Sequence, residues 1–250
     1  MDRPADVTAD ADWLRPCATL DRDTLCVGTP IALDGYARPL ELHECSWLHA
    51  AITGALGRGH QPPGAHMRSD WTLVPWACSS GWAVAWWSEA DAAALSMTSR
   101  ASRIGRRDVT LRFGPQMRMH TPPRYTAGVH LARLTLRTPL VVSSTQSDGR
   151  KVSARIADTR ALTSAAWSTA RKLALFPGEL TLSVLDARTE WVPVYYRGKV
   201  GRVDGLIGTV DVVCDASTRY VLEAASRGIG LGARVAYGCG RVEVTTLARR

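Results

Sequence analysis

The sequence GLGARVAYGCG, residues 230–240, contains four glycines in the pattern G-x-G-x5-G-x-G. A glycine in an ordered segment costs about 0.5–1 kcal/mol relative to alanine, so the pattern needs a compensating reason. Glycine permits positive φ and close backbone approach, and a glycine-rich loop also brings backbone N–H groups to a phosphate. The stretch is not a P-loop, because it contains no lysine, and a dinucleotide fingerprint requires a helix after the glycines.

The flanking residues place this glycine loop, residues 228–240, between a helix and a strand. Residues 220–227 (YVLEAASR) predict a short amphipathic helix, for which Gly228 or Gly230 is a suitable stop. Residues 241–247 (RVEVTTL) alternate in the way typical of a strand. The loop therefore leads from a helix into the last strand.

The rest of the chain predicts an α+β fold of two tandem ferredoxin-like (βαββαβ) units. We expect domains at 1–125 and 126–250, with a basic helical insertion at about 143–177 in the second. Apolar spacing predicts helices at 40–56 and 89–99, and alternation predicts strands at 72–78, 81–87, 109–113, 117–120, 129–142, 192–203 and 206–214.

The composition favours a polyanionic partner. The formal net charge is +8, and of 31 basic residues 28 are arginine and three are lysine. Arginine binds phosphate bidentately and stacks on bases, although a GC-rich genome also favours arginine codons. Six cysteines show no C-x-x-C pair, so we expect reduced thiols, no metal and no cofactor.

One uncharged stretch, residues 71–87, superficially resembles a membrane span. It is short for one and is broken by Pro75 and Gly81, so two buried strands joined by a turn are expected. The residues at the start, MDRPADVTADADW, lack the apolar core of a signal peptide. We therefore expect a cytoplasmic protein with no membrane partner.

Two basic clusters are candidates for nucleic-acid binding. Each could equally be a solvated face, because charge runs often are. The first, in the predicted insertion, is Arg150, Lys151, Arg155, Arg160, Arg171 and Lys172; the second, within residues 100–107 (RASRIGRR), includes Arg103, Arg106 and Arg107.

With this order of elements, the residues resemble a known family. Residues 198–212 (GKVGRVDGLIGTVDV) and 227–244 (RGIGLGARVAYGCGRVEV) resemble the repeat-associated mysterious protein (RAMP) superfamily of CRISPR systems, and more narrowly its repeat-RNA endonucleases. Residues 48–56 (LHAAITGAL) are similar to the family's short apolar helix after an early strand. The length and arginine content are more similar to the compact type IV variant than to the type I or III enzymes.

The resemblance implies a role for the glycine loop. Its glycines, Gly230, Gly232, Gly238 and Gly240, would let the backbone approach RNA phosphates, with Arg234 and Arg241 at the edges. Tyr195, Tyr196 and Tyr237 are candidates for stacking on unpaired bases. A tight connection needed only for packing is the alternative interpretation.

The resemblance also implies a metal-independent endoribonuclease, in which a 2′-hydroxyl attacks the adjacent phosphate. A histidine near the first helix is the usual proton carrier, which makes His43 and His49 candidates. An alternative set is Arg38 with Arg22 and Arg241, which would act by positioning and electrostatics because arginine is a poor base. We favour the arginine set, with His43 and His49 as rivals between which no motif chooses.

The expected partners are the CRISPR repeat RNA, folded as a hairpin in precursor crRNA, and other CRISPR effector subunits. A non-catalytic guide-RNA-binding subunit of an effector complex would share the glycine loop and the basic surface. A nucleic-acid-binding protein unrelated to CRISPR would explain the charge, but not the order of helix, glycine loop and strand.

Overall fold

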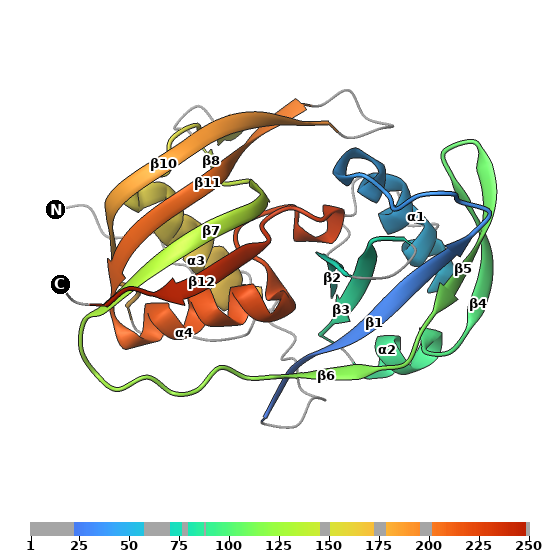
Figure 1. Ribbon diagram of the computed structural model, residues 1–250, viewed down its shortest axis with the longest axis horizontal. Coiled ribbons are helices and arrows are strands. Elements are labelled where there is room, and N and C mark those ends of the chain that lie inside the picture. The colour runs from blue at the N-terminus through green and yellow to red at the C-terminus, as the bar shows by residue number, and fades with distance from the viewer. Residues whose placement is uncertain are drawn as a thin grey trace, which may run out of the picture.

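Two antiparallel sheets lie side by side and define the α+β fold of the protein (Figure 1). The computed structural model describes residues 23–57, 71–76, 80–87, 89–145, 151–172, 179–195 and 202–248. Strands of the first sheet end at His120 and those of the second begin at His130. No helix in these described ranges is long and apolar enough to cross a membrane.

The first sheet has a ferredoxin-like order with an added hairpin. Its neighbours run β2-β3-β1-β5-β4, and β6 also pairs with β1. Taking β6 as the fourth strand gives the βαββαβ order, and the β4–β5 hairpin is additional. The elements are β1 Thr24–Asp34, η2 Leu42–Glu44, α1 Cys45–Ala55, β2 Trp71–Pro75, β3 Trp82–Trp86, α2 Glu89–Leu95, β4 Ser99–Ile104, β5 Arg107–Phe113 and β6 Met117–His120.

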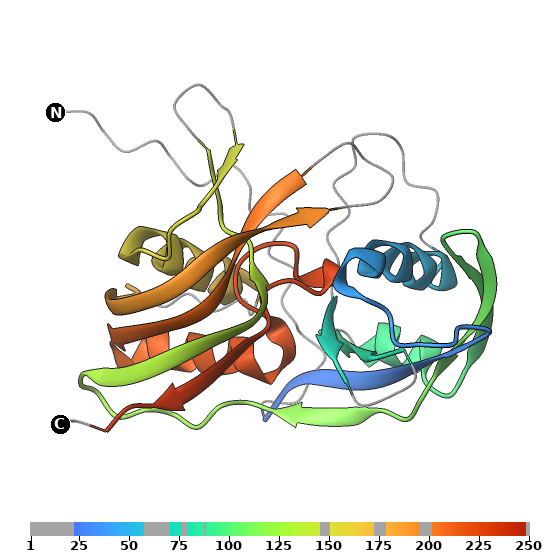
Figure 2. The ribbon, with the colours of Figure 1, turned by 45° about the horizontal axis from the view of Figure 1, so that its top comes forward.

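The second sheet repeats the same plan in the order β10-β11-β7-β12. Its helices α3 and α4 lie against one face of this sheet (Figure 2). The elements are β7 His130–Leu140, β8 Ser143–Thr145, β9 Lys151–Ser153, α3 Thr159–Lys172, β10 Leu182–Tyr195, β11 Arg202–Cys214, α4 Ala216–Ala224, η3 Ala225–Ile229, η4 Val235–Tyr237 and β12 Val242–Thr246. The predicted tandem ferredoxin-like fold is confirmed.

Apolar side chains on the predicted periods fill both cores. In the first unit, Leu48 and Ile52 of α1 are fully buried against Trp71 and Trp86, as expected for tryptophans of two buried strands. In the second unit, Leu162 of α3 packs with residues of β7 and β11. Small alanines at the buried positions of α3 let the helix approach the sheet closely.

Several segments differ from the sequence-based expectation. Helix α2 ends at Leu95 rather than at residue 99, and β10 covers residues 182–195, where a strand was expected only from residue 192. Residues 100–107 lie in β4, in the turn to β5 and at the start of β5, although their side chains alternate too weakly to predict a strand. The predicted basic insertion contains α3, which takes the place of the first helix in the second βαββαβ unit. The short hairpin of β8 and β9 precedes that helix.

The glycine loop, which belongs to the second unit, packs against the first unit. The Thr72 hydroxyl of β2 donates a hydrogen bond to the Val235 carbonyl at 3.0 Å, and the rings of His49 and Tyr237 stack 4.6 Å apart. A Cβ atom on Gly238, whose φ is +81°, would lie 2.8 Å from the Trp82 ring. The loop therefore docks the second unit onto the first.

This packing supports the alternative interpretation, in which the loop glycines form a tight connection needed for packing. All four are buried, and a Cβ on Gly230 or Gly232 would press against Val235 or the Val141 carbonyl. The ring of Tyr237, which was predicted to stack on RNA bases, stacks on the ring of His49. The side chain of Tyr195, and the whole of Tyr196, lie outside the described residues.

Replacing Gly240 with alanine is expected to destabilise the protein by at least about 2 kcal/mol. Gly240 has φ +75°, where a non-glycine residue costs about 1–2 kcal/mol, and its Cβ would overlap the backbone of Leu231. Gly54→Ala is the matched control, because nothing lies within 4 Å of that Cβ in α1. Alanine there should stabilise by about 0.5–1 kcal/mol. Denaturant unfolding measures both, and equal effects would contradict the packing role.

Candidate catalytic site

The segment between β1 and α1 is fixed in place by the first sheet. The Leu40 backbone N–H donates to the Ser80 carbonyl at 2.8 Å, and the Trp82 indole N–H donates to the Leu40 carbonyl at 2.8 Å. A capping box closes the start of η2, where the Glu41 backbone N–H donates to the Glu44 carboxylate at 2.9 Å. These bonds hold the side chains of residues 36–44 on a rigid base.

Glu44 organises the polar side chains around it. It is 4% exposed, and its carboxylate accepts hydrogen bonds from the Tyr36 hydroxyl at 2.6 Å and from Arg38 Nη1 and Nη2 at 2.8 and 3.0 Å. Burial by itself would raise the pKa of Glu44, but these hydrogen bonds lower it below its usual value. A buried charge paired in this way fixes the Arg38 fork in one orientation.

His43 and Arg107 complete what we name the Arg38 cluster: Tyr36, Arg38, Glu41, His43, Glu44 and Arg107. Glu41 bridges two members, since its carboxylate lies 3.3 Å from His43 Nδ1 and 3.5 Å from Arg38 Nη1. The guanidinium groups of Arg38 and Arg107 lie 5.7 and 5.5 Å from the centre of the Tyr36 ring. Arg38 and His43 are half-exposed. The cluster thus presents two guanidinium groups and an imidazole to solvent.

These groups match the needs of phosphate chemistry. Guanidinium groups stabilise the charge that develops on phosphate oxygens, and an imidazole moves protons near neutral pH. The sequence predicts roles for Arg38, His43 and Arg107 separately, and the structure brings them together. Tyr36, Glu41 and Glu44 were not predicted, although the Glu-x-x-Glu spacing before an apolar helix is a capping-box signal.

His49, the rival histidine, faces the interior of the protein. Its ring lies between Tyr237 and Trp71, 4.6 and 4.8 Å from their centres, and the residue is 8% exposed. Burial lowers the pKa of His49 to about 4. We therefore assign His49 to the interface between α1 and the glycine loop, where an RNA hydroxyl has no access.

This burial predicts a pH dependence of stability. The unfolded chain binds a proton at His49 near pH 6.5 and the folded protein only near pH 4, so stability falls as the pH drops through this window. The loss amounts to at most about 3 kcal/mol. His49→Phe keeps a ring in the stack and should flatten the decline. Melting temperatures of both proteins between pH 7 and 4 measure it, and parallel profiles would refute the assignment.

Within the described residues, Arg241 makes its hydrogen bonds outside the Arg38 cluster. The Arg241 backbone N–H donates to the Thr138 hydroxyl at 2.9 Å, its guanidinium donates to the Ser226 carbonyl, and burial lowers its pKa. No hydrogen bond or ion pair within the described ranges links Arg241 to Arg38. The expected convergence of these arginines therefore has no contact to support it, and Arg22 lies outside the described residues.

The predicted RNA-binding residues fall into two groups. Arg155 pairs with Asp204 at 2.7 Å beneath Trp191, Arg103 pairs with Asp108 at 3.1 Å, and Lys172 Nζ donates to the Gly232 carbonyl at 2.6 Å. Burial lowers the pKa of Lys172 to about 7, and its amino group is bound to the glycine loop. Arg106, Arg160, Arg171 and Arg234 are exposed, as are the ion-paired Arg103 and Arg155; Arg150 and the side chain of Lys151 lie outside the described part.

Comparison with known proteins places the fold. No family model and no curated protein sequence matches the chain. A Thermus thermophilus Cas6 in a product complex is 16% identical, with a TM-score of 0.62 over 88% of this chain and 99% of that one.

Two further structures agree with this result. A RAMP protein binding different RNA substrates is 13% identical, with a TM-score of 0.54 over 88% and 99% of the two chains. The product of a Cas6-related gene from Pyrococcus furiosus is 11% identical, with a TM-score of 0.53 over 89% and 98%. The chain therefore has the tandem ferredoxin-like fold of the Cas6 and RAMP proteins.

Proposed function

We propose that this protein is a metal-independent endoribonuclease that binds the CRISPR repeat hairpin, cleaves precursor crRNA and retains the mature crRNA. The observation that carries the proposal is the Arg38 cluster, which sits at the start of the first helix on a fold shared with RNA-bound Cas6 structures. The net charge of +8 supports a polyanionic partner. Membership of the type IV variant stays a prediction from length and arginine content.

The proposed reaction is a transfer of phosphate within the RNA. The 2′-hydroxyl loses its proton, its oxygen forms a bond to the adjacent phosphorus, and the bond from phosphorus to the 5′-oxygen breaks. The leaving oxygen takes up a proton, so the products carry a 2′,3′-cyclic phosphate and a 5′-hydroxyl. His43 is the proton carrier, and Arg38 and Arg107 stabilise the negative charge of the phosphorane. Glu44 and Glu41 are positioning residues that orient Arg38 and His43.

The RNA hairpin is proposed to bind through its phosphates and shape. Arg106 at the tip of the β4–β5 hairpin lies next in sequence to Arg107 of the cluster, so a basic edge leads to the site. Exposed Arg160 and Arg171 on α3 provide a second basic surface. We also propose that this protein, while it retains the cleaved RNA, binds further CRISPR effector subunits.

A non-catalytic guide-RNA-binding subunit is the second candidate function. One observation favours it: both terminal nitrogens of Arg38 already bond to Glu44, which leaves fewer donors for a phosphorane. Such a subunit would bind the processed RNA with similar contacts and would leave its bonds intact.

Incubation of the purified protein with its host's repeat RNA in EDTA distinguishes the two functions. Cleavage to a 2′,3′-cyclic phosphate and a 5′-hydroxyl supports the endoribonuclease, and product ends are identified by mass spectrometry. Tight binding of intact RNA would instead favour the guide-RNA-binding subunit, and an absence of binding would contradict both.

A further inference from the structure

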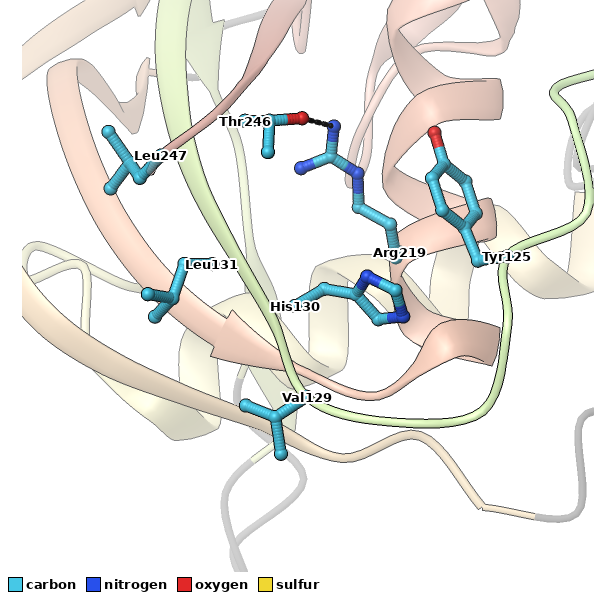
Figure 3. Close-up of a pocket in the computed structure, with 7 residues that line it drawn as sticks. All are labelled: Tyr125, Val129, His130, Leu131, Arg219, Thr246 and Leu247. Atoms are coloured by element: carbon cyan, nitrogen blue, oxygen red, sulfur yellow. Dashed lines mark hydrogen bonds between the residues drawn. The ribbon is translucent and has the colours of Figure 1, made fainter. Parts of the chain in front are cut away.

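A cavity of about 270 Å³ lies at the far edge of the second sheet, where β7 begins and β12 ends. Figure 3 shows side chains from four segments around it: the linker before β7, β7 itself, α4 and the end of β12. The Arg38 cluster belongs to the first unit, so this cavity is a separate feature of the surface. One of the lining residues is a buried arginine, Arg219.

Arg219 of α4 is only 3% exposed, yet much of its hydrogen-bonding capacity is unused. Its Nη2 donates to Glu223 at 2.5 Å and to the Thr246 hydroxyl at 3.1 Å. Nε and Nη1 have no acceptor within the described residues. In Figure 3 the terminal nitrogen without a hydrogen bond points away from the Tyr125 ring and toward β7. Buried donors without partners are costly, so the arrangement suits a ligand that brings acceptors.

The charges and the lining side chains of the cavity restrict which kind of ligand it can bind. Glu223 already neutralises Arg219, so the cavity does not require an additional anion. Val129, Leu131 and Leu247 provide apolar surface, and the Tyr125 ring lies 5.4 Å from the Arg219 guanidinium. A flat, uncharged group with carbonyl oxygens can accept hydrogen bonds from Arg219 and also pack on the apolar side chains. A bare phosphate can only accept the hydrogen bonds.

We propose that this cavity binds an unpaired keto base, uracil or guanine, of the RNA outside the hairpin stem. The carbonyl oxygens of these bases accept from arginine, whereas adenine presents an amino donor in the corresponding place. The identification of the polymer as RNA rests on the proposed function. Exposed Arg124, next in sequence to Tyr125, supplies positive charge for a flanking phosphate.

The test uses the octanucleotides U8 and A8, with no hairpin and no cleavage. Wild-type protein is expected to bind U8 about tenfold more tightly than A8. Arg219→Lys keeps a cation for Glu223 but removes the planar donors, and Leu247→Trp fills the cavity without altering Arg219. Both variants should lose the preference for U8, while their melting temperatures and hairpin affinities stay close to those of the wild type.

Equal affinity of the wild type for U8 and A8, or a preference that persists in Arg219→Lys, would overturn the proposal. Displacement of U8 by inorganic phosphate at constant ionic strength would also overturn it, by assigning the cavity to an anion. Because the readout is oligonucleotide preference, a failure of repeat cleavage would contradict the proposed function without changing this result.

Discussion

His43→Ala is expected to slow single-turnover cleavage of the repeat RNA by about 100- to 10,000-fold, the usual contribution of a positioned acid or base. Within the described residues the half-exposed His43 imidazole pairs with the exposed Glu41, so its removal leaves no buried group unpaired. The affinity for the hairpin should therefore stay within about twofold. Rapid mixing of excess enzyme with labelled RNA measures the cleavage rate, and filter binding measures the affinity.

His49→Phe is the matched histidine control for this variant. It removes an imidazole from the same helix region but preserves the ring that stacks on Tyr237 and Trp71. We expect its cleavage rate at pH 7.5 to equal that of the wild type. If His43→Ala cleaves normally and His49→Phe does not, the assignment of the two histidines is wrong.

Arg38→Ala is expected to reduce the cleavage rate by about 100- to 1,000-fold, the range for one lost oxyanion-stabilising donor. The variant also leaves the buried Glu44 carboxylate with fewer partners, which should lower the melting temperature. Arg38→Lys retains a positive charge for Glu44 and separates the two effects. It should restore most of the stability but only part of the rate, because lysine lacks the planar fork.

Arg112→Ala is the control for the removal of an arginine from an ion pair in the first unit. Arg112 pairs with Asp34 at 2.7 Å, and both side chains are about half-exposed. Its loss should cost little stability and no activity. Arg38→Ala with a wild-type single-turnover rate would remove Arg38 from the proposed site and favour an exclusively structural pair with Glu44.

The order of elements was predictable because it rests on local patterns. The helix at 45–55, the tryptophan-rich strands and the helix before the glycine loop all follow from apolar spacing within a few residues. Strand β4 was not predicted, although a strand at 109–113 was, since among the described strands β4 pairs only with β5 and that pair is held in the sheet by β1. The role of the glycines also required tertiary structure, because Trp82, which packs on Gly238, is distant in sequence.

The candidate site also depends on tertiary contacts, which local sequence patterns do not reveal. Local sequence nominated His43 and His49 equally, although the periodicity that buries Cys45, Leu48 and Ile52 also places His49 on the inner face of the helix. Only the fold shows that Glu41 joins His43 to Arg38. The Arg219 cavity had no signal in the sequence, since it is formed by the linker, β7, α4 and β12.

The central claim is that the 2′-hydroxyl of the RNA is the nucleophile and that protein side chains supply the rest of the chemistry. Its most direct test is a series of repeat RNAs in EDTA, each with a single 2′-deoxy nucleotide at a different position. The account predicts cleavage of the unmodified RNA and of every copy but one, in which the deoxy nucleotide immediately precedes the cut. Cleavage of every copy at the same bond would contradict it, because the attacking hydroxyl would then come from elsewhere.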